Sequence, residues 1–250
     1  MRVRHATGAS VGTVVCVHGA LDGASSFLRL ARRLADCDVV TYDRRGYRSS
    51  RGVPVRAGLA VQVDDLLDVL GAVPEAAATR CVVLGHSFGG LVALGAARER
   101  GRSAAIDAVV AYEPPFPWGS PATRHAGATS EDPAVAAEAF FRRIVGDAAW
   151  DRLSEHDKDV RRADGHALIE DLRVLGTAQP FEPSDVEVPV AIGLSDDAPD
   201  RRRASSMALA DALPRGRLVL FSSTGHGAHL SSPGRLAELV RAQLEVAAPG

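Results

Sequence analysis

A serine between two glycines is the first candidate for chemistry in this sequence. Ser87 stands in the pentapeptide Gly85-His86-Ser87-Phe88-Gly89, directly after the apolar run 81–84 and directly before an apolar segment rich in small residues. This order predicts a strand, a sharp turn that carries the serine, and a helix. Small neighbours permit such a turn, which projects the hydroxyl from the sheet edge toward a base. We therefore predict that Ser87 is a nucleophile; the alternative is a glycine-rich turn whose serine has no chemical role.

The composition is that of an ordinary globular enzyme or binding domain. The chain has 250 residues, of which 46% are hydrophobic and 24% charged, a size that suits one α/β domain. A net charge of −2 gives no reason to expect nucleic acid or an anionic membrane as a partner. The arginine runs, among them 201–203, are interpreted as solvent-facing.

Targeting and metal-binding signals are also missing from the sequence pattern. The N-terminus has no apolar signal-peptide core, and no apolar stretch reaches the roughly 18 residues of a membrane span. The three cysteines form no C-x-x-C pair, and the histidines show no H-E-x-x-H spacing. We expect a cytoplasmic protein with no metal, no membrane partner and no nucleic-acid partner.

Short β-branched runs alternate with longer helical patterns along most of the chain. Such alternation is typical of a mostly parallel sheet covered by helices on both faces, which is the α/β class. The predicted strands are 13–17, 38–42, 80–84, 106–111, 188–192 and 217–221, and the predicted helices are 24–35, 59–70, 88–100, 202–213 and 233–246.

One long segment breaks this alternation. Residues 114–183 lack β runs and are too many for an ordinary connection between strands, while 133–145 and 164–175 have helical periodicity. We therefore predict a single structural domain whose core, 1–113 and 184–250, is interrupted by a helical lid, 114–183. Its aromatic residues either form a small core of the lid or line an apolar substrate pocket; they are Phe116, Trp118, Phe140, Phe141 and Trp150.

Four motifs in this order resemble those of the α/β-hydrolase superfamily, and the resemblance covers nearly the whole chain from Val11 onward. One departure is Arg48, which replaces the second glycine of a D-x-R-G-x-G-x-S turn. The motifs are the strand and HG turn at 15–20, the turn at 43–49, the serine elbow at 85–89 and the G-H-x-x-H-L-x-x-P segment at 225–233. The resemblance implies the α/β-hydrolase fold, with a small helical lid between the strands that the family counts as the sixth and seventh.

A catalytic base must reach Ser87 from a loop after the last strand, and His226 follows the strand 217–221 at a suitable distance. The resemblance favours His226, because the family motif places the base directly after the glycine. His229, three residues on, is the competing candidate. His18 and His86 are expected to hold the two turns through side-chain hydrogen bonds.

The resemblance also implies a carboxylate that fixes the imidazole tautomer and stabilises the imidazolium. Asp196 is the preferred acid, because the segment 193–196 after the strand 188–192 matches the family's G-x-x-D pattern. Glu113 is the alternative, since some relatives place the acid after the strand that follows the nucleophile helix. Asp197 lies one residue out of register. The implied oxyanion hole uses the backbone N–H groups of Ala20, with Leu21 as a possible substitute, and of Phe88.

These assignments predict a serine hydrolase without a cofactor, which cleaves an ester, lactone or thioester of a small, largely apolar molecule through an acyl-enzyme on Ser87. One alternative uses the same site for acyl transfer, C–C cleavage, or a lyase or cyclase step in a biosynthetic pathway. Another is a ligand-binding sensor with negligible turnover. No isolated apolar surface helix stands out, so the sequence predicts no oligomeric state.

Overall fold

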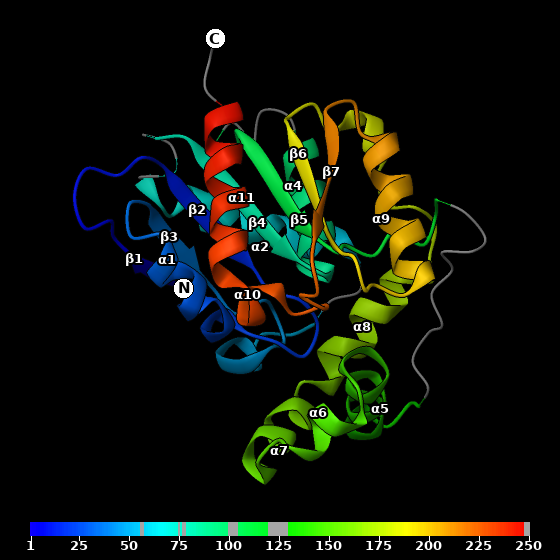
Figure 1. Ribbon diagram of the computed structural model, residues 1–250. Helices are drawn as coiled ribbons and strands as arrows, with labels where there is room; N and C mark the ends of the chain where they lie inside the picture. The colour runs from blue at the N-terminus through cyan, green and yellow to red at the C-terminus, as the bar shows by residue number, and fades with distance from the viewer. Residues whose placement is uncertain (56–57, 75, 77–78, 100–104, 120–129, 248–250) are drawn as a thin grey trace.

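The protein is built around a twisted sheet that is covered by helices on both faces, as Figure 1 shows. The computed structural model describes residues 1–55, 58–74, 76, 79–99, 105–119 and 130–247. Within them the sheet has seven strands in the order β1-β3-β2-β4-β5-β6-β7. The strands are β1 (Arg2–Arg4), β2 (Thr13–Val17), β3 (Asp38–Thr41), β4 (Cys81–His86), β5 (Ala108–Tyr112), β6 (Val190–Ser195) and β7 (Gly216–Phe221).

Six of these strands run parallel, and only β1 pairs antiparallel, with β3. All residues of β2, β4, β5 and β6 are buried, which explains why their sequences are continuous apolar runs rather than alternating ones. The predicted mostly parallel sheet is confirmed. The short edge strand β1 was not predicted, because its three residues contain two arginines and no apolar run.

Helices from different parts of the chain cover the two faces of the sheet. Helices α2 (Leu59–Gly71), α4 (Phe88–Arg98) and α9 (Asp200–Ala212) contribute to one cluster of buried apolar residues, and α1 (Leu28–Arg33) and α11 (Pro233–Val246) to the other. The predicted helix 24–35 is divided into a 3₁₀ helix, Ala24–Phe27, and α1. Among the described residues, no helix has the length and hydrophobicity needed to cross a bilayer.

In the described part of the chain between β5 and β6, four α-helices form what we call the helical insertion: α5 (Pro133–Val145), α6 (Asp147–Asp151), α7 (Glu155–Ala163) and α8 (Gly165–Leu175). Figure 1 shows them as one group below the sheet. The sequence predicted α5 correctly, since Pro133 occupies its first turn and the Asp132 carboxylate accepts hydrogen bonds from the N–H groups of Ala134 and Val135. It did not predict α6 or α7; α7 buries none of its residues and so lacks an apolar stripe. Residues 120–129 of the predicted lid lie outside the described residues.

A buried ion pair fastens the insertion to the core. Asp171 on α8 accepts hydrogen bonds from Arg44 Nη2 at 2.7 Å, Tyr47 Oη at 2.6 Å and Gln62 Nε2 at 3.1 Å. The Arg44 and Asp171 side chains are each only 1% exposed. Burial opposes the charged form of Arg44, but the Asp171 carboxylate raises the guanidinium pKa above its ordinary value. The Arg44 guanidinium therefore stays charged, and its contact with Asp171 ties α8 to the core.

Candidate active site

The serine turn has the strained backbone that a nucleophile elbow needs. Ser87 follows β4 and precedes α4 with φ 51° and ψ −124°, a conformation that costs a non-glycine residue on the order of 1–3 kcal/mol. The flanking glycines are required sterically. A Cβ on Gly85 would lie 2.4 Å from the Gly89 carbonyl oxygen, and one on Gly89 would lie 2.2 Å from the Val17 oxygen. The turn therefore closes only with glycine at both positions.

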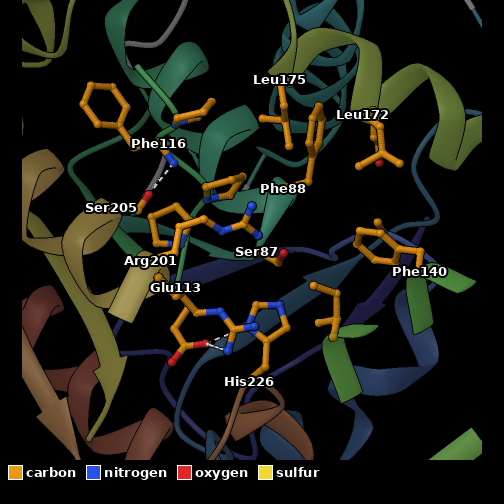
Figure 2. Close-up of a pocket in the computed structure, with 17 residues that line it drawn as sticks. Ser87, Phe88, Glu113, Phe116, Phe140, Leu172, Leu175, Arg201, Ser205 and His226 are labelled. Carbon is orange, nitrogen blue, oxygen red and sulfur yellow. Dashed lines mark hydrogen bonds and ion pairs between the residues drawn. The ribbon is translucent and has the colours of Figure 1, made fainter. Parts of the chain in front are cut away.

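A histidine and a carboxylate lie beside this serine. His226 Nδ1 is 2.7 Å from Glu113 Oε2, and the Glu113 side chain has no exposed surface. Figure 2 shows His226 and Glu113 on one side of Ser87, and Phe116, Leu172 and Leu175 on the opposite side of the same pocket. Because an ionised carboxylate only accepts hydrogen bonds, His226 donates from Nδ1 and keeps a lone pair on Nε2.

The sheet register explains why Glu113 is near Ser87. Ser87 N donates to the carbonyl of Tyr112, the last residue of β5, at 2.9 Å, so Glu113 leaves the sheet immediately beside the elbow. Glu113 itself has a positive φ of 46°, and its Oε1 accepts a hydrogen bond of 3.0 Å from the backbone N–H of Ser195. The ends of β4, β5 and β6 thus converge on the carboxylate.

The preferred acid of the sequence analysis lies elsewhere. Asp196 is exposed, and its Oδ1 accepts a hydrogen bond of 2.7 Å from the backbone N–H of Ser223. Asp197 accepts a hydrogen bond from the Ser195 hydroxyl. The structure therefore corrects the expected placement of Asp196 and sets the alternative, Glu113, against the imidazole. The reason lies in the sheet register. Gly193 of β6 pairs with Tyr112 of β5, so Asp196 lies three residues beyond that pair, and its carboxylate contacts Ser223 in the loop after β7.

The loop that carries His226 is fixed from two neighbouring strands. Tyr112 Oη donates to the carbonyl of Gly225 at 2.8 Å, and Gly225 N donates to Ser195 Oγ at 3.0 Å. His86 Nε2 donates to the carbonyl of His226 itself at 2.8 Å. These bonds place the imidazole without using either of its own ring nitrogens, which leaves Nδ1 for Glu113.

Burial and charge keep the histidine neutral. Burial, followed by the positive charge of Arg202, lowers the pKa of His226 well below its ordinary value. Burial raises the pKa of Glu113, and Arg202, whose Nη1 lies 3.0 Å from Glu113 Oε2, opposes this rise. A neutral imidazole that can accept a proton is therefore the resting form of His226 near neutral pH.

The other histidines near the elbow have structural contacts. His18 Nδ1 donates to Gly19 O at 2.8 Å, and its Nε2 accepts from Arg44 N at 2.8 Å, so both ring nitrogens hold the turn that contains Ala20. His229, the competing base, is buried and pairs through Nε2 with Asp22 Oδ2 at 3.0 Å. It therefore faces Asp22 rather than Glu113.

One group of described residues has the donor types of a metal site: Asp22, His86 and His229, with donor atoms within 4.8 Å of one another. A zinc ion bound at about 2.0–2.1 Å needs donors about 3.4 Å apart that converge on one point. The rings of His86 and His229 instead overlap, with centroids 4.3 Å apart and planes 43° apart. Their Nε2 atoms are engaged with the His226 carbonyl and Asp22. The Nδ1 atoms of both histidines are buried and have no hydrogen-bond partner among the described residues.

Two cavities meet at the serine. One, of about 80 Å³, extends toward Phe116 and α8; the other, of about 540 Å³, extends toward α7. Residues common to both are Ala20, Ser87, Phe140, Ile144, Arg202 and His226. The aromatic residues of the insertion have two different positions. Phe140 and Phe141 line the larger cavity, whereas Trp150 is 1% exposed and packs on Phe141 inside the insertion.

The comparisons with known proteins agree with this geometry. Residues 14–239 match the family model described as the alpha/beta hydrolase family. The chain belongs to this family. No curated protein matches the sequence.

Solved structures show the same fold at low sequence identity. MenH from S. aureus is 17% identical with a TM-score of 0.71, and 98% of each chain is covered. An esterase from Rhodococcus sp. is 19% identical with a TM-score of 0.71, covering 97% of this chain and 94% of its own. An enzyme that degrades N-acyl homoserine lactones is 18% identical with a TM-score of 0.69, covering 96% and 95%.

Two contacts of this α/β hydrolase were missed by the sequence analysis. The run 201–203 was interpreted as solvent-facing, but the Arg202 side chain is 18% exposed and lies against Glu113. Tyr112, whose hydroxyl holds the loop of His226, was given no role. A sequence signal existed for Arg202, since it stands at the start of a helix that follows the end of β6, the sheet edge where the other candidates gather.

Proposed function

We propose that this α/β hydrolase cleaves a carboxylic ester, lactone or thioester through an acyl-enzyme on Ser87, with His226 as the base and Glu113 as the acid behind it. The observation that carries the proposal is the 2.7 Å contact between His226 Nδ1 and a fully buried Glu113, next to a serine held at φ 51° on the same cavity. This combination supplies nucleophile, base and orienting carboxylate.

The reaction follows from the protonation states. Neutral His226 accepts the Ser87 proton at Nε2 as the hydroxyl oxygen attacks the substrate carbonyl, and Glu113 stabilises the imidazolium that forms. The N–H of Phe88, the first residue of α4, has no acceptor within its own helix and, with that of Ala20, donates to the oxyanion. The imidazolium then protonates the leaving group, and a water activated by His226 releases the acyl group.

The substrate class follows from the walls of the cavities. The smaller cavity is lined mostly by apolar side chains, and the larger one by a mixture of apolar and polar side chains. The larger one, at about 540 Å³, falls in the range of pockets for small molecules. The insertion supplies part of these walls, so we propose that it acts as a lid that selects the substrate. The esterase and the lactone-degrading enzyme among the structural neighbours are consistent with the same carbonyl chemistry.

A fluorophosphonate probe tests the assignment of the nucleophile. We expect the intact protein to be labelled on Ser87, and 4-nitrophenyl butyrate to give nitrophenol at a rate that Ser87→Ala reduces by about 10⁴-fold or more. Peptide mapping locates the label, and Ser184→Ala, a change at an exposed serine of the 3₁₀ helix Pro183–Asp185 that lines neither cavity, is the control. Absence of the label from Ser87 in folded protein would show that the proposal is wrong.

The same experiment separates the alternatives. A labelled serine with no turnover of esters, lactones or thioesters would favour a ligand-binding sensor. Turnover that accelerates when an alcohol or amine is added, with transfer of the acyl group to it, would indicate acyl transfer instead of hydrolysis.

A further inference from the structure

The larger cavity contains a cation that the proposed reaction does not use. It is lined by Ser87 and His226 of the core and by Arg161 of α7 in the helical insertion. Aliphatic and aromatic side chains form much of the wall between them, namely Phe140, Phe141, Ile144, Val145 and Leu230. A guanidinium group on such a wall is isolated from water on one side, where an electrostatic contact is stronger than in bulk solvent.

The hydrogen bonds of Arg161 leave part of its guanidinium unused. Its Nη1 donates to the carbonyl of Asp157 at 3.0 Å, while its Nε is buried and has no partner among the described residues. The Asp157 carboxylate is 3.9 Å from Nη1 and accepts a hydrogen bond of 2.7 Å from Ser154. The Arg161 side chain is 21% exposed and lies over the Phe141 ring at 5.2 Å, which restricts its movement.

The carboxylates near this cavity are engaged elsewhere. Asp22 pairs with His229, and Asp164 pairs with Arg48 and Arg51. Asp197, which also lines the cavity, accepts a hydrogen bond from the Ser195 hydroxyl. Arg202, the cation at the serine end, is taken up by Glu113. Burial and then the positive charge of Arg48 lower the pKa of Arg161, and the carboxylates of Asp157, Asp22 and Asp164 oppose this shift.

We propose that Arg161 binds an oxyanionic group of the substrate, such as a carboxylate, at the far end of an apolar chain or ring that lies in the larger cavity. This inference rests on the proposed function of Ser87 and adds the charge of the substrate to it. A planar guanidinium suits an oxyanion because it can donate two parallel hydrogen bonds. In Arg161, the Nε–H has no partner among the described residues.

Matched pairs of esters measure the effect of the charge. In the acyl series, mono-4-nitrophenyl adipate is compared with its neutral methyl ester; in the leaving-group series, 4-acetoxybenzoate is compared with its methyl ester. In one of the two series, we expect kcat/KM for the anionic substrate to exceed kcat/KM for its neutral methyl ester by about 10- to 100-fold. Arg161→Gln should reduce this ratio to about one, and Arg161→Lys should restore part of it because the charge remains but the planar fork does not.

A second arginine of the helical insertion provides the control. Arg152 follows α6 and is exposed, so Arg152→Gln makes the same change of net charge outside the cavity and should leave the ratio unchanged. A ratio near one in both series for the unmodified protein would overturn the inference. An equal loss of the ratio in Arg152→Gln would also overturn it, because the effect would then come from the overall charge of the insertion.

A binding measurement keeps this inference separate from the proposed reaction. Calorimetry on Ser87→Ala with adipate as the probe should give saturable binding that Arg161→Gln weakens about tenfold or more, at constant ionic strength. If esters are not turned over but adipate still binds through Arg161, the proposed reaction fails and the anion site stands. If esters are turned over but adipate binding and the ratio do not depend on Arg161, only the anion site fails.

Discussion

The carboxylates of two arginine–carboxylate pairs, Asp171 and Glu113, line the smaller cavity, and they differ in what surrounds them. Asp171 is held by Arg44, Tyr47 and Gln62, whose hydrogen-bond donors stay in place. Glu113 is held by Arg202 and a backbone N–H, and its remaining contact is a histidine that can gain and lose a proton. The comparison shows that a buried ion pair holds the fold when none of its partners changes its protonation state. It can take part in a reaction when one of its partners gains and loses a proton.

The first way to test this comparison is to remove the charge of the carboxylate at the histidine. Glu113→Gln should reduce kcat on an activated ester by about 10³- to 10⁴-fold, because the amide no longer stabilises the imidazolium and can favour the wrong tautomer. Asp196→Asn is the matched control and should stay within about threefold, since the asparagine oxygen still accepts the Ser223 N–H bond. Steady-state kinetics and circular dichroism measure activity and folding. A severe loss in Asp196→Asn with a mild one in Glu113→Gln would reverse the assignment.

The second test removes the charge of the other carboxylate. Asp171→Asn should lower the free energy of unfolding by about 3–5 kcal/mol, because it leaves the Arg44 guanidinium buried without a counter-charge. Urea denaturation measures the change. Asp159→Asn, on the exposed surface of α7, removes the same charge and should shift the melting temperature by less than about 2 °C. Similar stability losses for the two variants would mean that burial of the pair does not matter.

The third and smallest expected effect concerns the arginine beside Glu113. The positive charge of Arg202 lowers the pKa of His226, so the neutral base persists to lower pH, and the acidic limb of kcat/KM should lie below pH 6.5. Arg202→Met removes that charge, which should raise the pKa and move the limb to higher pH by about one unit. Arg202→Lys should keep the limb near its original position.

The control for this prediction is Arg203→Met on the same helix. Arg203 donates to the backbone carbonyl of Asp196 and does not contact Glu113, so its removal should leave the limb in place. A limb that moves to lower pH in Arg202→Met, or that moves equally in Arg203→Met, would contradict the electrostatic role given to Arg202.

Elements with strong local signals were predicted closely. Strand β2 and helices α5 and α11 have the predicted bounds, because a continuous apolar run marks the first and a proline in the first turn marks the other two. Helix α7 was missed, since charged residues fill it and no apolar stripe shows its period. Its position depends on contacts with α5 and α8, which a local pattern does not contain.

The sequence by itself determined the serine turn and the family, because the glycines on either side of Ser87 and the order of the motifs are local features. It left three carboxylates as candidates for the acid, each close to the end of a strand. Only the tertiary structure decided between their positions: the register of β4, β5 and β6 brings Glu113 beside Ser87, and the N–H of Ser195 and the Arg202 guanidinium hold its carboxylate toward His226. The contacts of Glu113 with Ser195 and His226 join residues 82 and 113 positions apart in the chain, so no local pattern of side chains encodes them.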